Sequence, residues 1–121
     1  MNITRVDYDN VPYSVMDIIL EWDSTRSAYA CAVLEFGKIG DYVYLGHSSD
    51  ELVAIALVSP GDPNILQFLA AKKPGCGKIF LECICRDCKY LALHAMNESR
   101  GFYDKCGFTH IRNGNYTKGG D

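Results

Sequence analysis

The sequence predicts an α/β fold of the α+β kind, built as a single domain over residues 1–121. Strand-like and helix-like segments follow one another in the order strand, two helices, three strands, helix, strand, helix and a short ending. One apolar run, residues 52–59, is hydrophobic on both faces and therefore suits a strand at the centre of a sheet. A chain of 121 residues can bury its own core but has no room for a second.

The chain is predicted to open with a strand and a helix. Residues 2–8 alternate in a way that favours the strand. In residues 13–22 apolar side chains recur at helical spacing, and Pro12 suits the first turn of that helix. Asp9 or Asn10 is expected as its N-cap. The predicted buried face of this helix contains Val15, Ile18, Ile19 and Trp22.

Residues 26–36 fit two interpretations, a helix and an alternating strand. We favour the helix. Ser24 or Thr25 can cap its start, and the glycines at 37 and 40 suit a helix stop followed by a turn.

The middle of the chain is predicted to form three consecutive strands. Residues 41–47 and 51–59 are rich in β-forming residues, and residues 48–50 between them indicate a hairpin. The run Pro-Gly-Asp-Pro at 60–63 is a strong turn signal, after which residues 64–71 supply the third strand.

A glycine-bracketed turn, Gly75-Cys76-Gly77, separates this third strand from a predicted helix at residues 78–87. Such a turn leaves backbone N–H groups unpaired at a helix N-terminus, where the helix dipole favours anions. The glycines also let the backbone approach a phosphate closely. The turn therefore predicts an anion site.

The last third of the chain is predicted to contain an apolar strand at residues 90–96 and a short helix that holds residues 101–108, GFYDKCGF. Residues 110–112 and 115–118 flank Asn113-Gly114, a favoured hairpin dipeptide, so two short strands should close the sheet. Residues 119–121 are expected to form a frayed tail.

Together, Lys72-x-x-Gly75-x-Gly77 and the segment GFYDKCGF resemble the two segments that define the GNAT (Gcn5-related N-acetyltransferase) superfamily. The resemblance covers nearly the whole order of elements and implies a central mixed, mostly antiparallel sheet flanked by helices. It also implies acetyl-CoA as cosubstrate and a primary amine as acceptor. Here the family's usual Arg or Gln at the first motif position is Lys72, and Pro74 has no N–H to donate.

The resemblance further implies a set of cofactor-binding residues, most of which lie around the glycine turn. Asn97 is the least certain position, because it can equally serve as the N-cap of the following helix. The implied cofactor-binding residues are Leu69, Ala70, Lys72, Lys73, Gly75, Cys76, Gly77, Lys78, Asn97 and Tyr103.

Tyr103 is the predicted general acid, because a phenol with a pKa of about 10 stays protonated at neutral pH and can match a departing thiolate. The alternative is a purely structural ring that packs beside Phe102 and Phe108. His94 is the candidate general base, since its pKa range is suitable. A water that relays the proton to a carboxylate such as Glu35 or Glu51 is an equal alternative.

The net charge of −3 and the scattered basic residues argue against nucleic acid as a partner, although Lys72, Lys73 and Lys78 suit a small polyanion. No segment resembles a signal peptide or a membrane span, so a soluble cytoplasmic protein is expected. The ending is shorter than the resemblance implies, so the acceptor pocket is expected to be incompletely walled, and a homodimer is a candidate assembly. A polyamine, a lysine side chain, a protein N-terminus and a small amine metabolite are all open as acceptors.

Two functions from other classes also remain open. A non-catalytic module of the same fold would bind coenzyme A or a protein partner without turnover. A small metal-binding protein would use Cys83, Cys85 and Cys88, but residues i and i+2 point in different directions on a helix. We therefore expect the six cysteines to be free thiols that pack as small hydrophobes, with no metal site.

Overall fold

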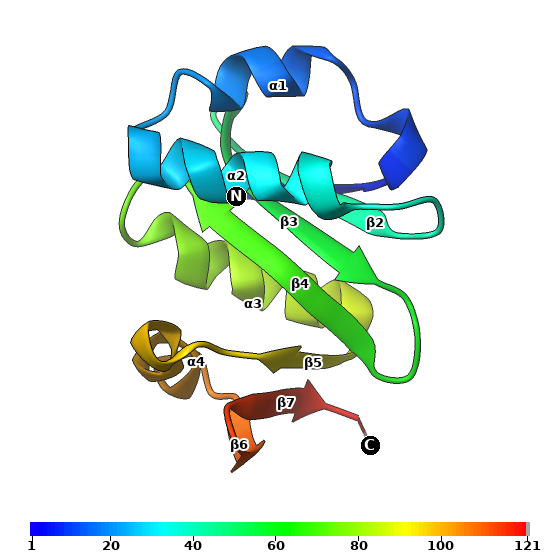
Figure 1. Ribbon diagram of the computed structural model, residues 1–121, viewed down its shortest axis with the longest axis vertical. Coiled ribbons are helices and arrows are strands. Elements are labelled where there is room, and N and C mark those ends of the chain that lie inside the picture. The colour runs from blue at the N-terminus through cyan, green and yellow to red at the C-terminus, as the bar shows by residue number, and fades with distance from the viewer. Residues whose placement is uncertain (121) are drawn as a thin grey trace.

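The computed structural model describes residues 1–120 and shows a seven-stranded sheet with helices on both faces (Figure 1). The predicted order of elements is confirmed, and so is the helix at residues 26–36. The strands are β1 (Asn2–Asp7), β2 (Tyr42–Ser48), β3 (Glu51–Ser59), β4 (Asn64–Ala71), β5 (Tyr90–His94), β6 (Thr109–Arg112) and β7 (Asn115–Gly119). The helices are α1 (Ser14–Ile19), α2 (Ser24–Phe36), α3 (Cys76–Cys88) and α4 (Arg100–Lys105), with 3₁₀ turns at Tyr8–Asn10 and Asn97–Ser99.

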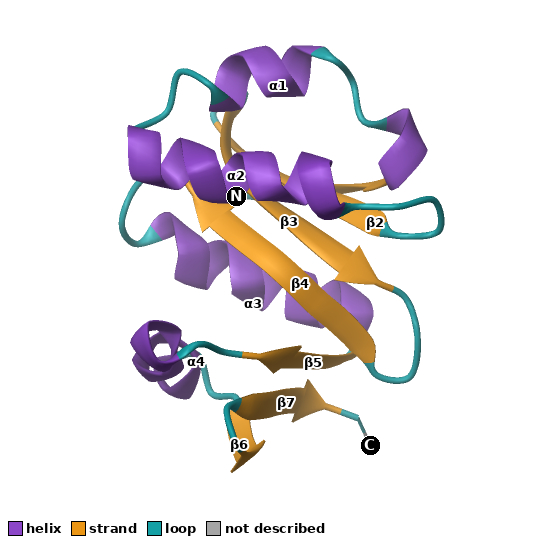
Figure 2. Cartoon of the chain, in the orientation of Figure 1, coloured by secondary structure: helices purple, strands orange, loops and turns teal. Residues whose placement is uncertain are grey.

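The sheet is mixed and mostly antiparallel, as predicted. Its strand order is β1-β2-β3-β4-β5-β7-β6, and every neighbouring pair is antiparallel except β4 and β5. The parallel contact is short, because only Asn64 and Ile65 of β4 are in register with Leu91 and Ala92 of β5. Beyond these residues the two strands separate toward their C-terminal ends (Figure 2).

Two tight hairpins have the backbone conformation that their sequences predict. Ser49 and Asp50 between β2 and β3 have φ of 51° and 65°, and Asn113 and Gly114 between β6 and β7 have φ of 53° and 82°. Positive φ at both central residues is the requirement of the type I′ turn, whose twist matches that of the strands. Asn113-Gly114 is the dipeptide that favours this turn, whereas Ser49-Asp50 forms it without a glycine.

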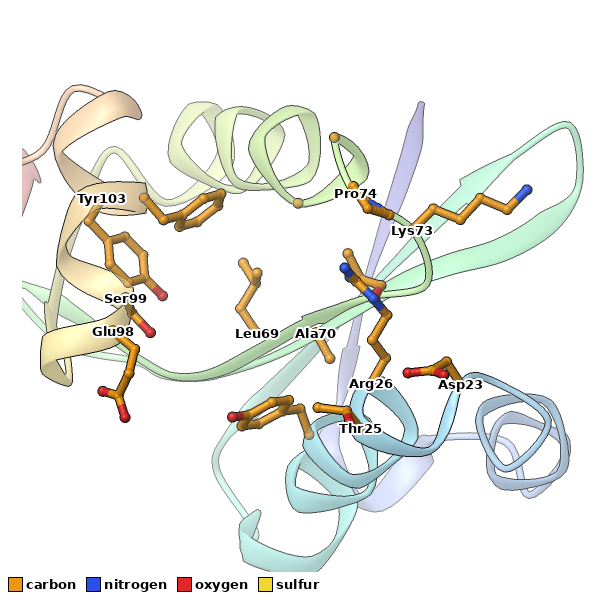
Figure 3. A pocket seen from close by; sticks show the side chains of 15 residues that line it. Asp23, Thr25, Arg26, Leu69, Ala70, Lys73, Pro74, Glu98, Ser99 and Tyr103 are labelled. Atoms are coloured by element: carbon orange, nitrogen blue, oxygen red, sulfur yellow. The ribbon is translucent and has the colours of Figure 1, made fainter.

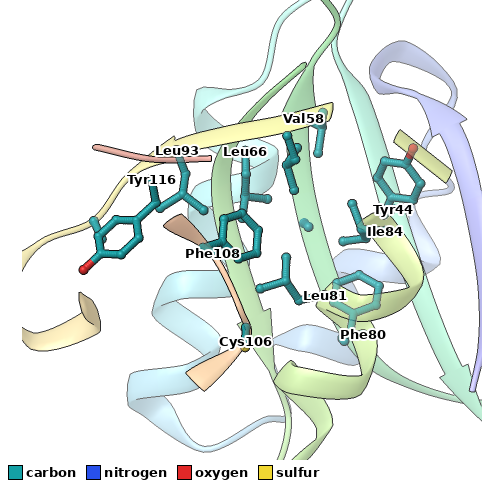
Figure 4. Packing of buried hydrophobic residues seen from close by; sticks show 14 of the residues in the cluster. Tyr44, Val58, Leu66, Phe80, Leu81, Ile84, Leu93, Cys106, Phe108 and Tyr116 are labelled. Atoms are coloured by element: carbon teal, nitrogen blue, oxygen red, sulfur yellow. The ribbon is translucent and has the colours of Figure 1, made fainter. Parts of the chain in front are cut away.

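The core forms two clusters, one on each face of the sheet, and β3 contributes to both. Ala54 and Ala56 belong to the cluster beneath α3, whereas Ile55 and Leu57 belong to the cluster beneath α1 and α2. Figure 4 shows side chains of α3, with Phe80 among them, packed in the first cluster. The central position predicted for the apolar run is confirmed.

The helix starts differ from the predictions. The N-cap of α1 is Tyr13, because Asp9 and Asn10 form a separate 3₁₀ turn, and the N-cap of α2 is Asp23 rather than Ser24 or Thr25. No side chain makes a cap hydrogen bond at either start. Val15, Ile19 and Trp22 are buried as predicted, but Ile18 is 39% exposed. Val15 and Ile19 lie one turn apart on the buried face of α1, whereas Ile18 is rotated away from Ile19 by about 100°.

The segment around α4 also needs correction. The predicted strand at 90–96 ends at His94, and the predicted helix at 101–108 ends at Lys105, after which Gly107 turns with φ of 83°. Asn97 caps no helix through its side chain, since Met96 and Ser99 occupy the N-cap positions. At the C-terminus, Gly119 belongs to β7 rather than to a frayed tail, and Asp121 lies outside the described residues.

The cysteines are all free, and Cys83, Cys85 and Cys88 lie in α3. Within residues 1–120 no three His, Cys, Asp or Glu side chains are grouped as metal ligands. Among the helices of the described chain, none combines the length and apolar character that crossing a bilayer requires.

Candidate functional site

A cleft of about 600 Å³ lies where β4 and β5 separate. Its floor is the C-terminal part of β4, and its walls come from the start of α2, the glycine turn before α3, and the segment from Glu98 to Tyr103 (Figure 3). The lining residues are Asp23, Thr25, Arg26, Tyr29, Leu69, Ala70, Ala71, Lys73, Pro74, Gly75, Gly77, Glu98, Ser99, Phe102 and Tyr103.

A bulge in β4 contributes to this opening. Leu57 of β3 is opposite Phe68, and Val58 is opposite Leu66, so Gln67 is an extra residue on β4. A bulge bends its strand and increases the local twist. Because the pairing with β5 stops at Ile65, the edge of β4 beside the cleft has no strand partner within residues 1–120. Its backbone groups are therefore available to a ligand with amides of its own.

The N-terminus of α3 is an anion site in both geometry and charge. Gly75 is the N-cap with φ of 91°, a left-handed conformation that favours glycine, and no side chain caps the helix. The Cys76 N–H lies 3.3 Å from the carbonyl oxygen of Lys73, but the next N–H groups of the first turn have no preceding helical acceptor. A Cβ on Gly75 would meet nothing within 4 Å, so the backbone at this point is open to a phosphate.

The lysines predicted for the anion site divide into two groups. Lys73 lines the cleft. Lys72 does not, because its ammonium pairs with the carboxylate of Glu51 on β3. Lys78 is exposed on α3, and Cys76 is half-buried against the core, and neither is among the lining residues.

Tyr103 faces the cleft from α4 and is packed on its other sides. Its ring lies 5.1 Å from that of Phe102, 5.7 Å from Phe108 and 6.1 Å from Tyr116, measured between centroids. Burial raises the pKa of Tyr103 to about 12, with a smaller contribution from Cys106. The phenol therefore stays protonated well above neutral pH. The two interpretations of this residue are compatible, since the ring packs while Figure 3 shows the hydroxyl directed toward the cavity.

His94 and Asn97 lie outside the lining of the cleft. Both are exposed, and the Nδ1 atom of His94 is 3.0 Å from the Oδ1 atom of Asn115. Neither Glu35 nor Glu51 lines the cleft. The carboxylate that does so on the Tyr103 side is Glu98.

Sequence reasoning missed every lining residue of α2 and the two that precede α4. Arg26 lines the cleft, and its Nη1 atom donates to the carbonyl oxygen of Ala71 at 2.8 Å. Glu98 and Ser99 lie in the 3₁₀ turn after β5. No local pattern marks these three residues, because they reach the cleft only through the packing of distant segments.

No protein-family model and no curated protein matches the sequence. Solved structures do resemble the chain. GCN5 from Tetrahymena superposes with a TM-score of 0.71 at 13% identity over 100% of this chain and 97% of that one. YhhK from Escherichia coli, solved bound to coenzyme A, superposes with a TM-score of 0.64 at 19% identity over 99% of this chain and 100% of that one. An acetyltransferase of the GNAT family from Staphylococcus aureus superposes with a TM-score of 0.62 at 14% identity over 99% of this chain and 100% of that one.

These likenesses establish the class of fold, which is that of the GNAT acyl-CoA N-acyltransferases. They cover essentially the full length of both chains in each comparison. The fold class inferred from the glycine turn and the GFYDKCGF segment is confirmed.

Proposed function

We propose that the protein is an N-acetyltransferase that transfers the acetyl group of acetyl-CoA to a primary amine. One observation carries this proposal: a single cleft joins the uncapped N-terminus of α3 to the protonated phenol of Tyr103. The fold supports it, as does the coenzyme A found in the YhhK structure.

The residues of the cleft fit the chemistry of coenzyme A. Its pyrophosphate suits the open backbone at Gly75, where the dipole of α3 adds to the charge of Lys73. The amides of its pantetheine arm suit the unpaired edge of β4 near Leu69 and Ala70. This arrangement directs the thioester end toward Tyr103.

When bound, the thioester supplies the activated acetyl group. In the transfer, a bond forms between the amine nitrogen and the carbonyl carbon, and the bond from that carbon to sulfur breaks. Tyr103 donates its proton to the departing sulfur and is reprotonated from solvent. Burial keeps the phenol protonated at neutral pH, so its proton is present when the thiolate develops beside it.

The acceptor must lose a proton before it attacks, because an ammonium has no free electron pair. In this proposal the carboxylate of Glu98 takes that proton, directly or through one water, since it lines the same cleft as Tyr103. The role of His94 as general base stays a prediction. It would require a relay that carries the proton from the acceptor, because His94 lies outside the cleft lining. A polyamine, a lysine side chain, a protein N-terminus and a small amine metabolite all remain candidate acceptors.

A non-catalytic module that binds coenzyme A is the second candidate. The observation that favours it is the pairing of Lys72 with Glu51, which leaves Lys73 as the only lysine of the turn in the described cleft lining. Such a module would bind acetyl-CoA and release no product.

The test is product formation from acetyl-CoA and a panel of amines: a diamine, a polyamine, and lysine peptides with free and blocked N-termini. Products should be measured by mass, because the free cysteines of the protein would react with a thiol reagent. We expect acetylation of at least one amine. Binding of acetyl-CoA without product would support the non-catalytic module, and absence of binding would contradict both proposals.

A further inference from the structure

The glycine turn is short of cations for a pyrophosphate. Its first motif position, Lys72, is paired with Glu51 and does not line the cleft. Lys78 lies in the first turn of α3, but it is exposed and is not among the lining residues. Lys73 lines the cleft but is itself exposed, so it acts as a hydrated point charge on a flexible stem. The turn therefore lacks a fixed positive group.

Arg26 brings such a group from α2. Its side chain lines the cleft together with Lys73, Pro74 and Gly75, and its Nη1 donates to the carbonyl oxygen of Ala71, the last residue of β4. Figure 3 shows the guanidinium of Arg26 reaching across to the end of β4, just before the glycine turn. The hydrogen bond fixes the guanidinium at the base of the turn.

The guanidinium still has capacity for an anion. One of its five N–H donors is used by Ala71, and no carboxylate lies within 4.0 Å of it among residues 1–120. Asp23 lines the same wall, one turn earlier, without forming an ion pair with Arg26 in the described chain. The half-buried position of Arg26 also strengthens its attraction for an anion relative to a fully solvated charge.

The backbone of α2 is held firmly enough to position this side chain. Ser27 and Ala30, which follow Arg26, are buried, and Ala30 packs in the cluster between α2 and the sheet. A charged group on a fixed helix loses less freedom when it binds than a lysine in an exposed loop.

We propose that Arg26 is a phosphate-binding residue of the coenzyme A site and supplies from α2 the guanidinium that the glycine turn lacks. This inference rests on the proposed function for the identity of the ligand. The planar fork of arginine matches phosphate oxygens with two parallel hydrogen bonds, which a lysine cannot do. In this proposal α2 holds the cofactor together with the glycine turn.

The test is the dissociation constant of coenzyme A, measured by isothermal titration calorimetry on the full chain. Arg26→Gln removes the charge and keeps an N–H donor on a shorter side chain. Arg86→Gln is the matched control, because Arg86 is exposed in the last turn of α3 and lies outside the cleft lining. Arg26→Gln should weaken binding by roughly tenfold to a hundredfold, and Arg86→Gln by less than about twofold, because an exposed distant charge is screened.

Two further measurements separate the phosphate role from a structural one. Pantetheine, which has no phosphate, should shift the melting temperatures of the unmodified protein and Arg26→Gln equally. Arg26→Lys keeps the charge but loses the fork, so it should bind coenzyme A several-fold more weakly than the unmodified protein. Circular dichroism of each variant shows whether it is folded.

The outcomes distinguish the two proposals. Absence of coenzyme A binding by the unmodified protein would overturn the proposed function itself. Normal binding with equal dissociation constants for Arg26→Gln and Arg86→Gln would overturn only the role of Arg26. If Arg26→Gln weakens the binding of pantetheine as much as that of coenzyme A, the phosphate role is overturned as well. If Arg26→Gln does not fold, an unchanged affinity of Arg26→Lys for coenzyme A overturns it.

Discussion

The ammonium of Lys72 pairs with the carboxylate of Glu51, and this contact turns the first residue of the glycine motif away from the cleft. We therefore predict that Lys72→Ala changes the dissociation constant of coenzyme A by less than about threefold, because an exposed charge outside the site is screened. The melting temperature should change little, since exposed ion pairs contribute little stability. Calorimetry that shows a loss as large as that of Arg26→Gln would mean that the pair opens and that Lys72 binds phosphate.

Tyr103→Phe should remove the proton donor and preserve the packing of the ring against Phe102 and Phe108. We expect kcat to fall by roughly 10²-fold to 10⁴-fold, with the affinity for acetyl-CoA nearly unchanged. Steady-state kinetics and calorimetry measure the two quantities. A variant that keeps full activity would leave Tyr103 a structural residue.

The alkaline side of the pH profile gives a separate test of Tyr103. Its pKa is raised to about 12 by burial, so the protonated form that acts as the acid is retained as the pH rises through 10, where a free phenol would ionise. Activity on an amine that is already neutral should therefore show no loss up to about pH 10. A decline centred near pH 10 in a protein that circular dichroism shows to be folded would contradict this assignment.

Glu98→Gln should lower both kcat and kcat/KM by roughly 10²-fold or more if the carboxylate takes the proton of the acceptor. Glu35→Gln is the matched control, because Glu35 is exposed on α2 and does not line the cleft. His94→Ala, compared at the same pH values, decides between the two candidate bases. Full activity in Glu98→Gln with a large loss in His94→Ala would reverse our assignment.

One prediction concerns the fold. The Tyr44 hydroxyl donates to the Asp87 carboxylate and lies 3.2 Å from the Cys88 sulfur, which ties β2 to the end of α3. Tyr44→Phe should lower the free energy of unfolding by about 1.5 kcal/mol, the lower end of the range for a charged partner, because Asp87 is partly solvated. Urea unfolding measures this difference.

Tyr42→Phe on the same strand is the control, since its hydroxyl makes no hydrogen bond within residues 1–120. Equal stabilities of the two variants would show that the contact of Tyr44 with Asp87 contributes nothing.

The hairpins and the glycine turn were predictable because local chemistry decides them. Asn113-Gly114 adopts two positive φ values at low cost, and Gly75 is a residue that tolerates the left-handed N-cap of α3. The starts of α1 and α2 could not be predicted from the sequence. Tyr13 and Asp23 occupy the N-cap positions without a side-chain hydrogen bond, so the usual capping pattern is absent.

The cleft could be predicted only in part, for a similar reason. Its glycine turn and Tyr103 belong to continuous segments, whereas Arg26 and Glu98 reach it by long-range packing. The sequence also did not predict that the side chain of Lys73 lines the cleft and that of Lys72 does not. The extra residue at Gln67 changes which side of β4 each later residue faces, and no feature of the sequence predicts that bulge.

The most direct test of the cofactor site is the melting curve with and without excess acetyl-CoA for the unmodified protein, Gly75→Asn and Gly75→Asp. Both variants place a side chain of similar size at φ of 91°, in space that is open, so they differ mainly in charge. Ligand at about 100 times its dissociation constant should stabilise the unmodified protein by roughly 2.7 kcal/mol, a shift of several degrees.

We predict that Gly75→Asn keeps part of this shift and that Gly75→Asp loses it, because a carboxylate would then occupy the anion site. No shift in the unmodified protein, or an equal shift in all three, would contradict the placement of the cofactor phosphates at the start of α3.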